Sequence, residues 1–150
     1  MIHKKQRVSK TTRQVACKYV HKPHLLNGYK YDLRIYVLVT SMDPLKIYIY
    51  HNGLVRFATA KYTCSKKAIK KRFIHLTNYS IQKKSSNYVK NTGDASPEKD
   101  KNLDDGEDDV ATKWDLYSLR EKFKELGINY DEIHKKIKDT IIKTIMSVES

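Results

Sequence analysis

The sequence predicts an α+β fold, a mostly antiparallel sheet followed by two C-terminal helices. Apolar and polar residues alternate through much of 29–62, which indicates strands. After residue 113 the apolar residues recur at spacings of three and four, as they do along helices that cover a core. Strands gathered in one part of a chain and helices in another are typical of α+β proteins. The 150 residues are enough for one domain with its own core.

Four segments in the first part of the chain have the composition of strands. They are 14–20, 29–40, 45–50 and 54–62. Turn signals separate them: Asn27-Gly28 precedes the second, Asp43-Pro44 follows it, and His51-Asn52-Gly53 precedes the fourth. Because short turns join the last three segments, we expect them to form an antiparallel meander.

The middle of the chain is expected to be irregular. Residues 63–72 are interpreted as a basic connection, and 73–85 as a short strand followed by a loop. Residues 86–112 are rich in Asp, Asn, Gly and Lys, which predicts a disordered acidic insert within the domain. The acidic cluster at 104–109 lacks the ligand spacing of a calcium-binding loop.

Two helices are predicted to close the chain, at 114–127 and 130–148. The first has apolar residues near one stripe and ends at Gly127, a common helix stop. Its stripe consists of Trp114, Tyr117, Leu119, Phe123 and Leu126. The second is expected to face the core through Ile133, Ile137, Ile141, Ile145 and Val148.

The charge of the chain is concentrated in its first part. Residues 1–90 contain 20 Lys and Arg against two Asp and Glu, a net charge of +18, whereas 91–112 carry −6 and 113–150 carry +1. A basic region of this strength favours a polyanionic partner, which could be nucleic acid, a phosphate-bearing ligand, an acidic membrane or an acidic peptide. A compositional bias toward lysine is the alternative. Cys17 and Cys64 have no metal-ligand spacing, and no apolar run reaches membrane-spanning length, so we expect a reducing, cytoplasmic setting.

A row of charges lies on one face of the predicted strand 29–40. Lys30, Asp32 and Arg34 are two residues apart, so their side chains share a face. A solvated outer face is one interpretation. A cleft is the other, because Lys and Arg are permanent donors to phosphate or carboxylate. Arg56 interrupts an otherwise small or apolar strand, and it needs an anion from within the protein or from a ligand. The sequence has no glycine-rich phosphate loop.

Several blocks of the chain, taken in order, resemble a known family. They are YKYDLRIYVLVTSMDPLKIYIYHNGLVRFATAKY, FIHLTNYSIQKKS, KW and IKDTIIKTIMSVE. Together they resemble the tubulin–tyrosine ligase-like family, in particular its polyglutamylase type, from about Val15 to Glu149. The resemblance implies an ATP-grasp catalytic domain that attaches amino acids to protein carboxylates. Residues 1–150 would then be an incomplete, internal part of that domain, with a partial ATP-grasp-like fold.

The resemblance implies a nucleotide site. Its ATP-binding residues would be Cys17, Lys18, Tyr19 and Val20 at the adenine, Lys30 at phosphate, Asp32 near the ribose, and Thr77 and Asn78 of the HLTN segment. The family often has Gln at the position of Cys17, which leaves backbone contacts to carry the recognition of the base.

An amino-acid site is implied beside the nucleotide. Its substrate-binding residues would be Arg56, which holds the carboxylate of the incoming amino acid, together with Tyr79, Ser80 and Lys113. Arg34 and Arg56 match the catalytic arginines of the family's cleft. His75 is interpreted as structural. The basic site favours glutamate as the added amino acid, with glycine as an alternative.

The implied reaction uses ATP to add glutamate to glutamate side chains of acidic tubulin C-terminal tails, through an acyl phosphate. The Mg²⁺ ligands are expected outside this chain, so the 150 residues alone are expected to be inactive. The alternative is a non-catalytic remnant that binds nucleotide or a tubulin tail. A nucleic-acid-binding module is disfavoured because the sequence has no matching fold signature. We expect a monomer without membrane contact, in the cytoplasm at microtubules, cilia or basal bodies.

Overall fold

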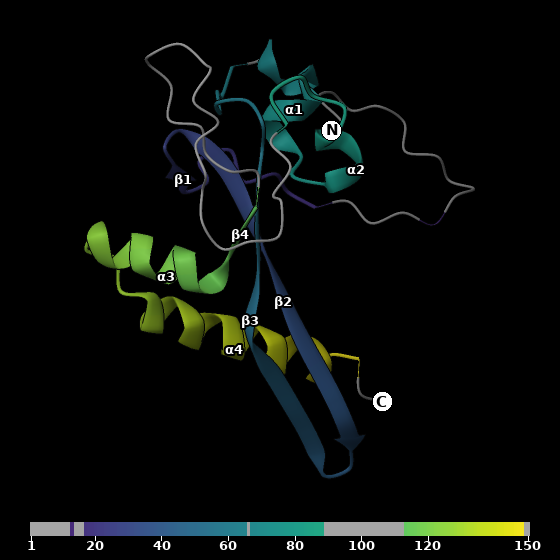
Figure 1. Cartoon of the computed structure of the whole chain (residues 1–150). Helices are drawn as coiled ribbons and strands as arrows, with labels where there is room; N and C mark the ends of the chain where they lie inside the picture. The colour runs from purple at the N-terminus through teal and green to yellow at the C-terminus, as the bar shows by residue number, and fades with distance from the viewer. Residues whose placement is uncertain (1–12, 14–16, 66, 89–112, 149–150) are drawn as a thin grey trace. The chain divides into compact units, whose positions relative to one another are not determined.

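The computed structural model describes residues 13, 17–65, 67–88 and 113–148 (Figure 1). Its elements are β1 (Leu25–Leu26), β2 (Tyr29–Met42), β3 (Leu45–Phe57), the 3₁₀ turn η1 (Ala68–Lys70), α1 (Arg72–His75), α2 (Tyr79–Gln82), β4 (Lys113–Asp115), α3 (Leu116–Glu125) and α4 (Tyr130–Met146). The strands form one sheet in the order β1-β2-β3-β4. The predicted α+β fold is confirmed.

Packing divides the chain into two compact units. The first unit comprises Met1–Asp32 and Arg56–Thr112, and the second comprises Leu33–Val55 and Lys113–Ser150. The two long strands β2 and β3 contribute residues to both units.

In the first unit, the predicted turn at Asn27-Gly28 is confirmed. Both residues have positive φ, 50° and 80°, which is the conformation that tight two-residue hairpins require. The turn pairs β1 antiparallel to β2, with Leu26 opposite Tyr29. Leu26 is 1% exposed and belongs to the core of this unit, together with Phe57, Ala58, Ala68 and Ile74.

Other predictions for the first unit are wrong. Residues 17–20 are irregular, not a strand, and 14–16 lie outside the described residues. Residues 73–85 contain the short helices α1 and α2 where a strand and loop were predicted, because a brief apolar run fits either structure equally well. Most of the predicted insert, 89–112, also lies outside the described residues.

The predicted meander is wrong as well. In the second unit β2 and β3 form one long hairpin joined at Asp43-Pro44, and β3 continues through Asn52 and Gly53 (Figure 1). The expected turn does not form there because Gly53 is buried where another segment approaches it closely: a Cβ on Gly53 would lie 2.4 Å from the carbonyl oxygen of Arg34. Residues 58–62 are irregular, although the N–H of Ala58 donates to Lys30 O at 2.9 Å.

The two C-terminal helices are confirmed. Helix α3 begins after Asp115 and buries Leu116, Leu119 and Phe123, while Gly127 follows its end with φ of 69°. Helix α4 was expected to face a core, but none of its described residues is buried, and its isoleucine stripe is half-buried. Among the described residues, no helix combines the length and the apolar content needed to cross a bilayer.

Replacing Asp115 with alanine is expected to destabilise the protein by about 1 kcal/mol at neutral pH, because Asp115 is the N-cap of α3. Its Oδ1 accepts hydrogen bonds from Ser118 N at 2.8 Å and Ser118 Oγ at 2.6 Å. The bond from the Ser118 hydroxyl is the main cause that lowers the pKa of Asp115. The stabilisation is therefore present above the unfolded-state pKa of about 3.9, and it is lost as the pH falls through the lower folded-state value.

Urea unfolding of both proteins at pH 7 and pH 3 measures this difference. The two free energies of unfolding should converge on acidification. Asp139→Ala is the matched control, because Asp139 is an exposed helix residue paired only with Lys143 at 2.7 Å among the ion pairs of the described residues. A control loss as large as that of Asp115→Ala would contradict the capping role.

Candidate functional site

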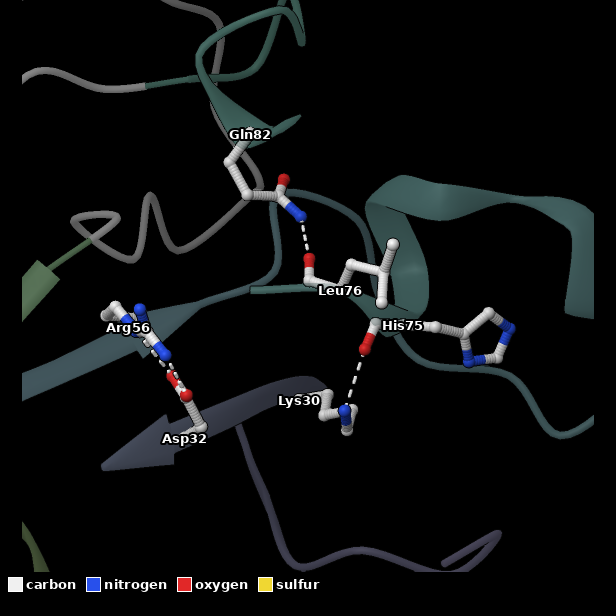
Figure 2. Close-up of polar contacts among 6 residues, drawn as sticks. All are labelled: Lys30, Asp32, Arg56, His75, Leu76 and Gln82. Carbon is white, nitrogen blue, oxygen red and sulfur yellow. Dashed lines mark hydrogen bonds and ion pairs between the residues drawn. The ribbon is translucent and has the colours of Figure 1, made fainter. Parts of the chain in front are cut away.

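The charged row predicted on β2 meets Arg56 of β3 in the first unit. Arg56 Nε donates to Asp32 Oδ1 at 2.8 Å, and Arg56 Nη2 donates to Asp32 Oδ2, so the pair is bidentate (Figure 2). The Arg56 side chain is 18% exposed and that of Asp32 36%. The anion that Arg56 requires is therefore supplied from within the protein, and the paired carboxylate fixes the plane of the guanidinium.

Lys30 lies on the same face of β2 and contacts the helical segment. Its Nζ donates to the carbonyl oxygen of His75 at 2.7 Å (Figure 2). The same atom lies 5.7 Å from the ring centre of Tyr19. Partial burial lowers the pKa of Lys30, and the nearby Asp32 carboxylate opposes this shift. A partly desolvated ammonium is suited to bind a phosphate group, because the phosphate supplies the negative charge that stabilises it.

His75 connects three parts of the first unit, which confirms its structural interpretation. The side chain is 2% exposed. Its Nε2 lies 3.0 Å from Ala68 O, which can only accept, so Nε2 carries the proton and Nδ1 accepts from the Tyr19 hydroxyl at 2.9 Å. Burial raises the pKa of Tyr19, and this keeps the hydroxyl protonated as the donor. The adenine segment predicted at 17–20 is thus tied to the chain just before Thr77.

Gln82 is a buried residue that the sequence analysis missed. It is 1% exposed, and its amide accepts hydrogen bonds from Thr59. On the other side the amide donates to Leu76 O (Figure 2). An isolated glutamine at the end of a polar segment has no periodicity that predicts burial. The HLTNYSIQ block includes Gln82, but the resemblance to the family implies no role for it.

The remaining nucleotide candidates of the first unit differ in exposure. Cys17, Lys18 and Val20 are exposed, and so is Asn78, which is the N-cap residue of α2. Thr77 is 8% exposed. The structure thus bonds Lys30 and Tyr19 to His75, and Thr77 follows two residues later along the chain. Asp32 is bonded to Arg56 instead.

The candidates for the amino-acid site are divided between the units. Tyr79 and Ser80 are exposed at the start of α2 in the first unit, and Lys83 Nζ lies 5.5 Å from the ring centre of Tyr79. Arg34, exposed on β2, and Lys113, half-buried at the start of β4, belong to the second unit. Arg56 is therefore the candidate whose surroundings the structure defines best.

The described residues do not match a magnesium site. Within them, no three His, Cys, Asp or Glu side chains gather in a way that could hold a metal ion. Asp32, the acidic residue of the candidate site, is engaged by Arg56.

Comparison with known proteins agrees with the resemblance seen in the sequence. The family model described as "Tubulin-tyrosine ligase family" matches residues 1–150. The chain is 43% identical over 149 residues to tubulin monoglutamylase TTLL4 of Mus musculus and 38% identical over 150 residues to tubulin polyglutamylase TTLL5 of the same species, covering 99% of the chain in each case. It is 36% identical over 139 residues, 93% of the chain, to tubulin polyglutamylase ttll-4 of Caenorhabditis elegans. The chain spans 12%, 10% and 20% of the lengths of these relatives.

Proposed function

Because the chain belongs to the tubulin-tyrosine ligase family, we propose that it is part of an ATP-dependent ligase that adds glutamate to tubulin. The relatives bear the names tubulin monoglutamylase and tubulin polyglutamylase, which supports glutamate as the added residue. The net charge of +18 over residues 1–90 supports an acidic tubulin tail as the acceptor, because the tail would be drawn to a surface of opposite charge. Its place of action would be the microtubule.

One observation carries the proposal: Lys30, Asp32 and Arg56 form a group of charges beside the segment that leads into Thr77 and Asn78. In this proposal Lys30 binds phosphate, and Asp32 contributes to the nucleotide site while it orients Arg56. Thr77 and Asn78 complete the nucleotide contacts, and the backbone of 17–20 contacts the adenine.

Arg56 is proposed to hold the carboxylate of the incoming glutamate. A guanidinium has five N–H donors, and Asp32 engages two of them in a planar fork, which fixes the direction in which the group presents its charge. Tyr79 and Ser80 would line the same substrate. The roles of Arg34 and Lys113 in the second unit rest on the resemblance alone.

The chemistry follows from joining a carboxylate to an amine. An acceptor carboxylate oxygen attacks the γ-phosphorus of ATP, ADP leaves, and an acyl phosphate forms. The amine of glutamate then attacks the acyl carbon, phosphate leaves, and an amide bond results. Negative charge develops on the phosphoryl oxygens and then on the oxygen of the tetrahedral carbon, and fixed cations such as Lys30 lower the energy of such states.

Replacing Lys30 with methionine in the full-length protein tests the nucleotide site. The side chain keeps its apolar stem and loses its ammonium, so ATP affinity is expected to fall about 10- to 100-fold. Calorimetric titration with ATP and Mg²⁺ measures the affinity, and transfer of labelled glutamate to tubulin measures the activity.

Lys46→Met is the matched control, because Lys46 is an exposed lysine of β3. Its ATP affinity should equal that of the unaltered protein. If Lys30→Met binds ATP as tightly as the control does, the proposed phosphate contact is wrong. If the unaltered protein transfers no glutamate to tubulin, the proposed activity is wrong.

A further inference from the structure

The side chain of Gln82 has hydrogen-bond partners at both its oxygen and its nitrogen, and the proposed function leaves it without a role. Its Oε1 accepts from Thr59 N at 3.1 Å and from Thr59 Oγ1 at 2.6 Å. Its Nε2 donates to Leu76 O and lies 3.5 Å from Phe73 O. At 1% exposure the amide would be costly to bury without partners, so these bonds fix both its place and its orientation.

The two partners of Gln82 lie close in sequence to residues of the proposed site. Thr59 follows Arg56 by three residues, beyond the end of β3, and Leu76 directly precedes Thr77. The two partners are joined by no hydrogen bond to each other among the contacts of the described residues, so Gln82 acts as a bridge between them. Figure 2 shows the amide of Gln82 directed at Leu76, with Arg56 and Asp32 on the neighbouring strands.

We propose that Gln82 is a positioning residue that sets the spacing between Arg56 and the Thr77-Asn78 segment. This inference rests on the proposed function, because Arg56 is there assigned to glutamate and Thr77-Asn78 to the nucleotide. The bridge then fixes how far the bound amino acid lies from the bound ATP. A displacement of about 1 Å between two reacting groups is enough to slow a reaction substantially, so a residue that touches neither ligand controls the rate.

Gln82→Glu separates the two halves of the bridge. An ionised carboxylate still accepts from Thr59 but cannot donate to Leu76 O, whereas a protonated carboxyl group can donate again. A buried carboxyl group has a raised pKa, so the bridge should be restored as the pH is lowered through the mildly acidic range. Glutamate transfer by the full-length variant is expected to be about tenfold slower than that of the unaltered protein at pH 8, with the difference shrinking at pH 6.

Two further variants keep the test decisive. Asn87→Asp introduces the same charge change at an exposed amide five residues away, and its rate relative to the unaltered protein should not depend on pH. Thr59→Val removes the hydroxyl that bonds Gln82 at nearly constant volume, and it should also slow glutamate transfer, as Gln82→Glu does. A Gln82→Glu profile parallel to that of the unaltered protein would overturn the proposal, as would a variant with a lower Tm but unchanged KM and kcat.

Amide hydrogen exchange tests whether Gln82 joins the two segments, and the measurement needs no bound ligand. The 76–78 segment should exchange faster in Gln82→Glu at pH 8 than at pH 6, after correction for the intrinsic rates measured with Asn87→Asp, whereas the Thr59 amide should stay protected because the carboxylate still accepts its hydrogen bond. Unchanged protection of the 76–78 segment would refute the bridge itself. If the 76–78 segment loses protection at pH 8 as expected but the unaltered protein transfers no glutamate, the proposed function is wrong and the bridge is still supported.

Discussion

Replacing Arg56 with glutamine in the full-length protein is expected to lower kcat/KM for glutamate by about 10²- to 10³-fold. The substitution removes the donors proposed to hold the carboxylate of the substrate, and it leaves the Asp32 carboxylate, 36% exposed, without the cation that pairs with it. Since Asp32 is proposed to lie in the nucleotide site, its released charge would also face ATP. Both effects reduce the rate in the same direction.

Three related variants distinguish the sources of this loss. Arg56→Lys keeps the charge but not the planar fork, so it should recover only part of the activity. Asp32→Asn leaves Arg56 in place but turns an amide toward donors that were bonded to a carboxylate, so it should raise the KM for glutamate through loss of orientation. Arg120→Gln is the matched control, because Arg120 is half exposed and pairs at 2.9 Å with Asp131, 81% exposed.

Steady-state kinetics of labelled glutamate transfer to tubulin measure all four proteins. The control should retain its kcat/KM within about twofold, since exposed ion pairs contribute little. An unchanged KM for glutamate in both Arg56→Gln and Arg56→Lys would exclude Arg56 from the amino-acid site. A loss confined to the KM for ATP would instead assign Arg56 to the nucleotide.

The features that the sequence predicts correctly depend on residues close to one another in the chain. Asn27-Gly28 forms its turn because two adjacent residues tolerate positive φ, and Gly127 ends a helix for the same local reason. The shared face of Lys30 and Asp32 follows from the two-residue period of a strand. These interpretations need no knowledge of what packs against the segment.

The incorrect predictions concern residues whose partners are distant in sequence. Asn52-Gly53 has the signature of a turn, but Asn52 Oδ1 accepts from Leu116 N at 3.0 Å, and this contact joins residues 64 positions apart. Asp32 pairs with Arg56, 24 positions away, and no local pattern indicates this pairing. The buried amide of Gln82 likewise depends on Thr59, which no local pattern relates to it. Pairings of this kind are fixed by the fold and not by the neighbouring residues.

Replacing Gly53 with alanine is expected to destabilise the second unit by about 1–3 kcal/mol. An added Cβ would lie 2.4 Å from the backbone oxygen of Arg34 and 3.1 Å from Leu116 Cδ1. A side chain can rotate away from such a contact, but a strand backbone can move only if the hairpin shifts with it. At this size of protein the cost corresponds to a fall in Tm of about 2–4 °C per kcal/mol, measured by calorimetry.

Gly127→Ala is the control, because it should destabilise the protein through backbone strain and not through a steric contact. Nothing lies within 4 Å of a Cβ there, and the strain comes from its φ of 69°. Gly127→Asn should therefore recover stability relative to Gly127→Ala, because asparagine tolerates this backbone conformation. Gly53→Asn should be at least as unstable as Gly53→Ala, because any Cβ meets the same oxygen. If Gly53→Asn were more stable than Gly53→Ala, the backbone conformation at position 53 would be the reason for glycine, and not the close approach of Arg34. The close approach would then not explain why β3 continues through a turn-like sequence.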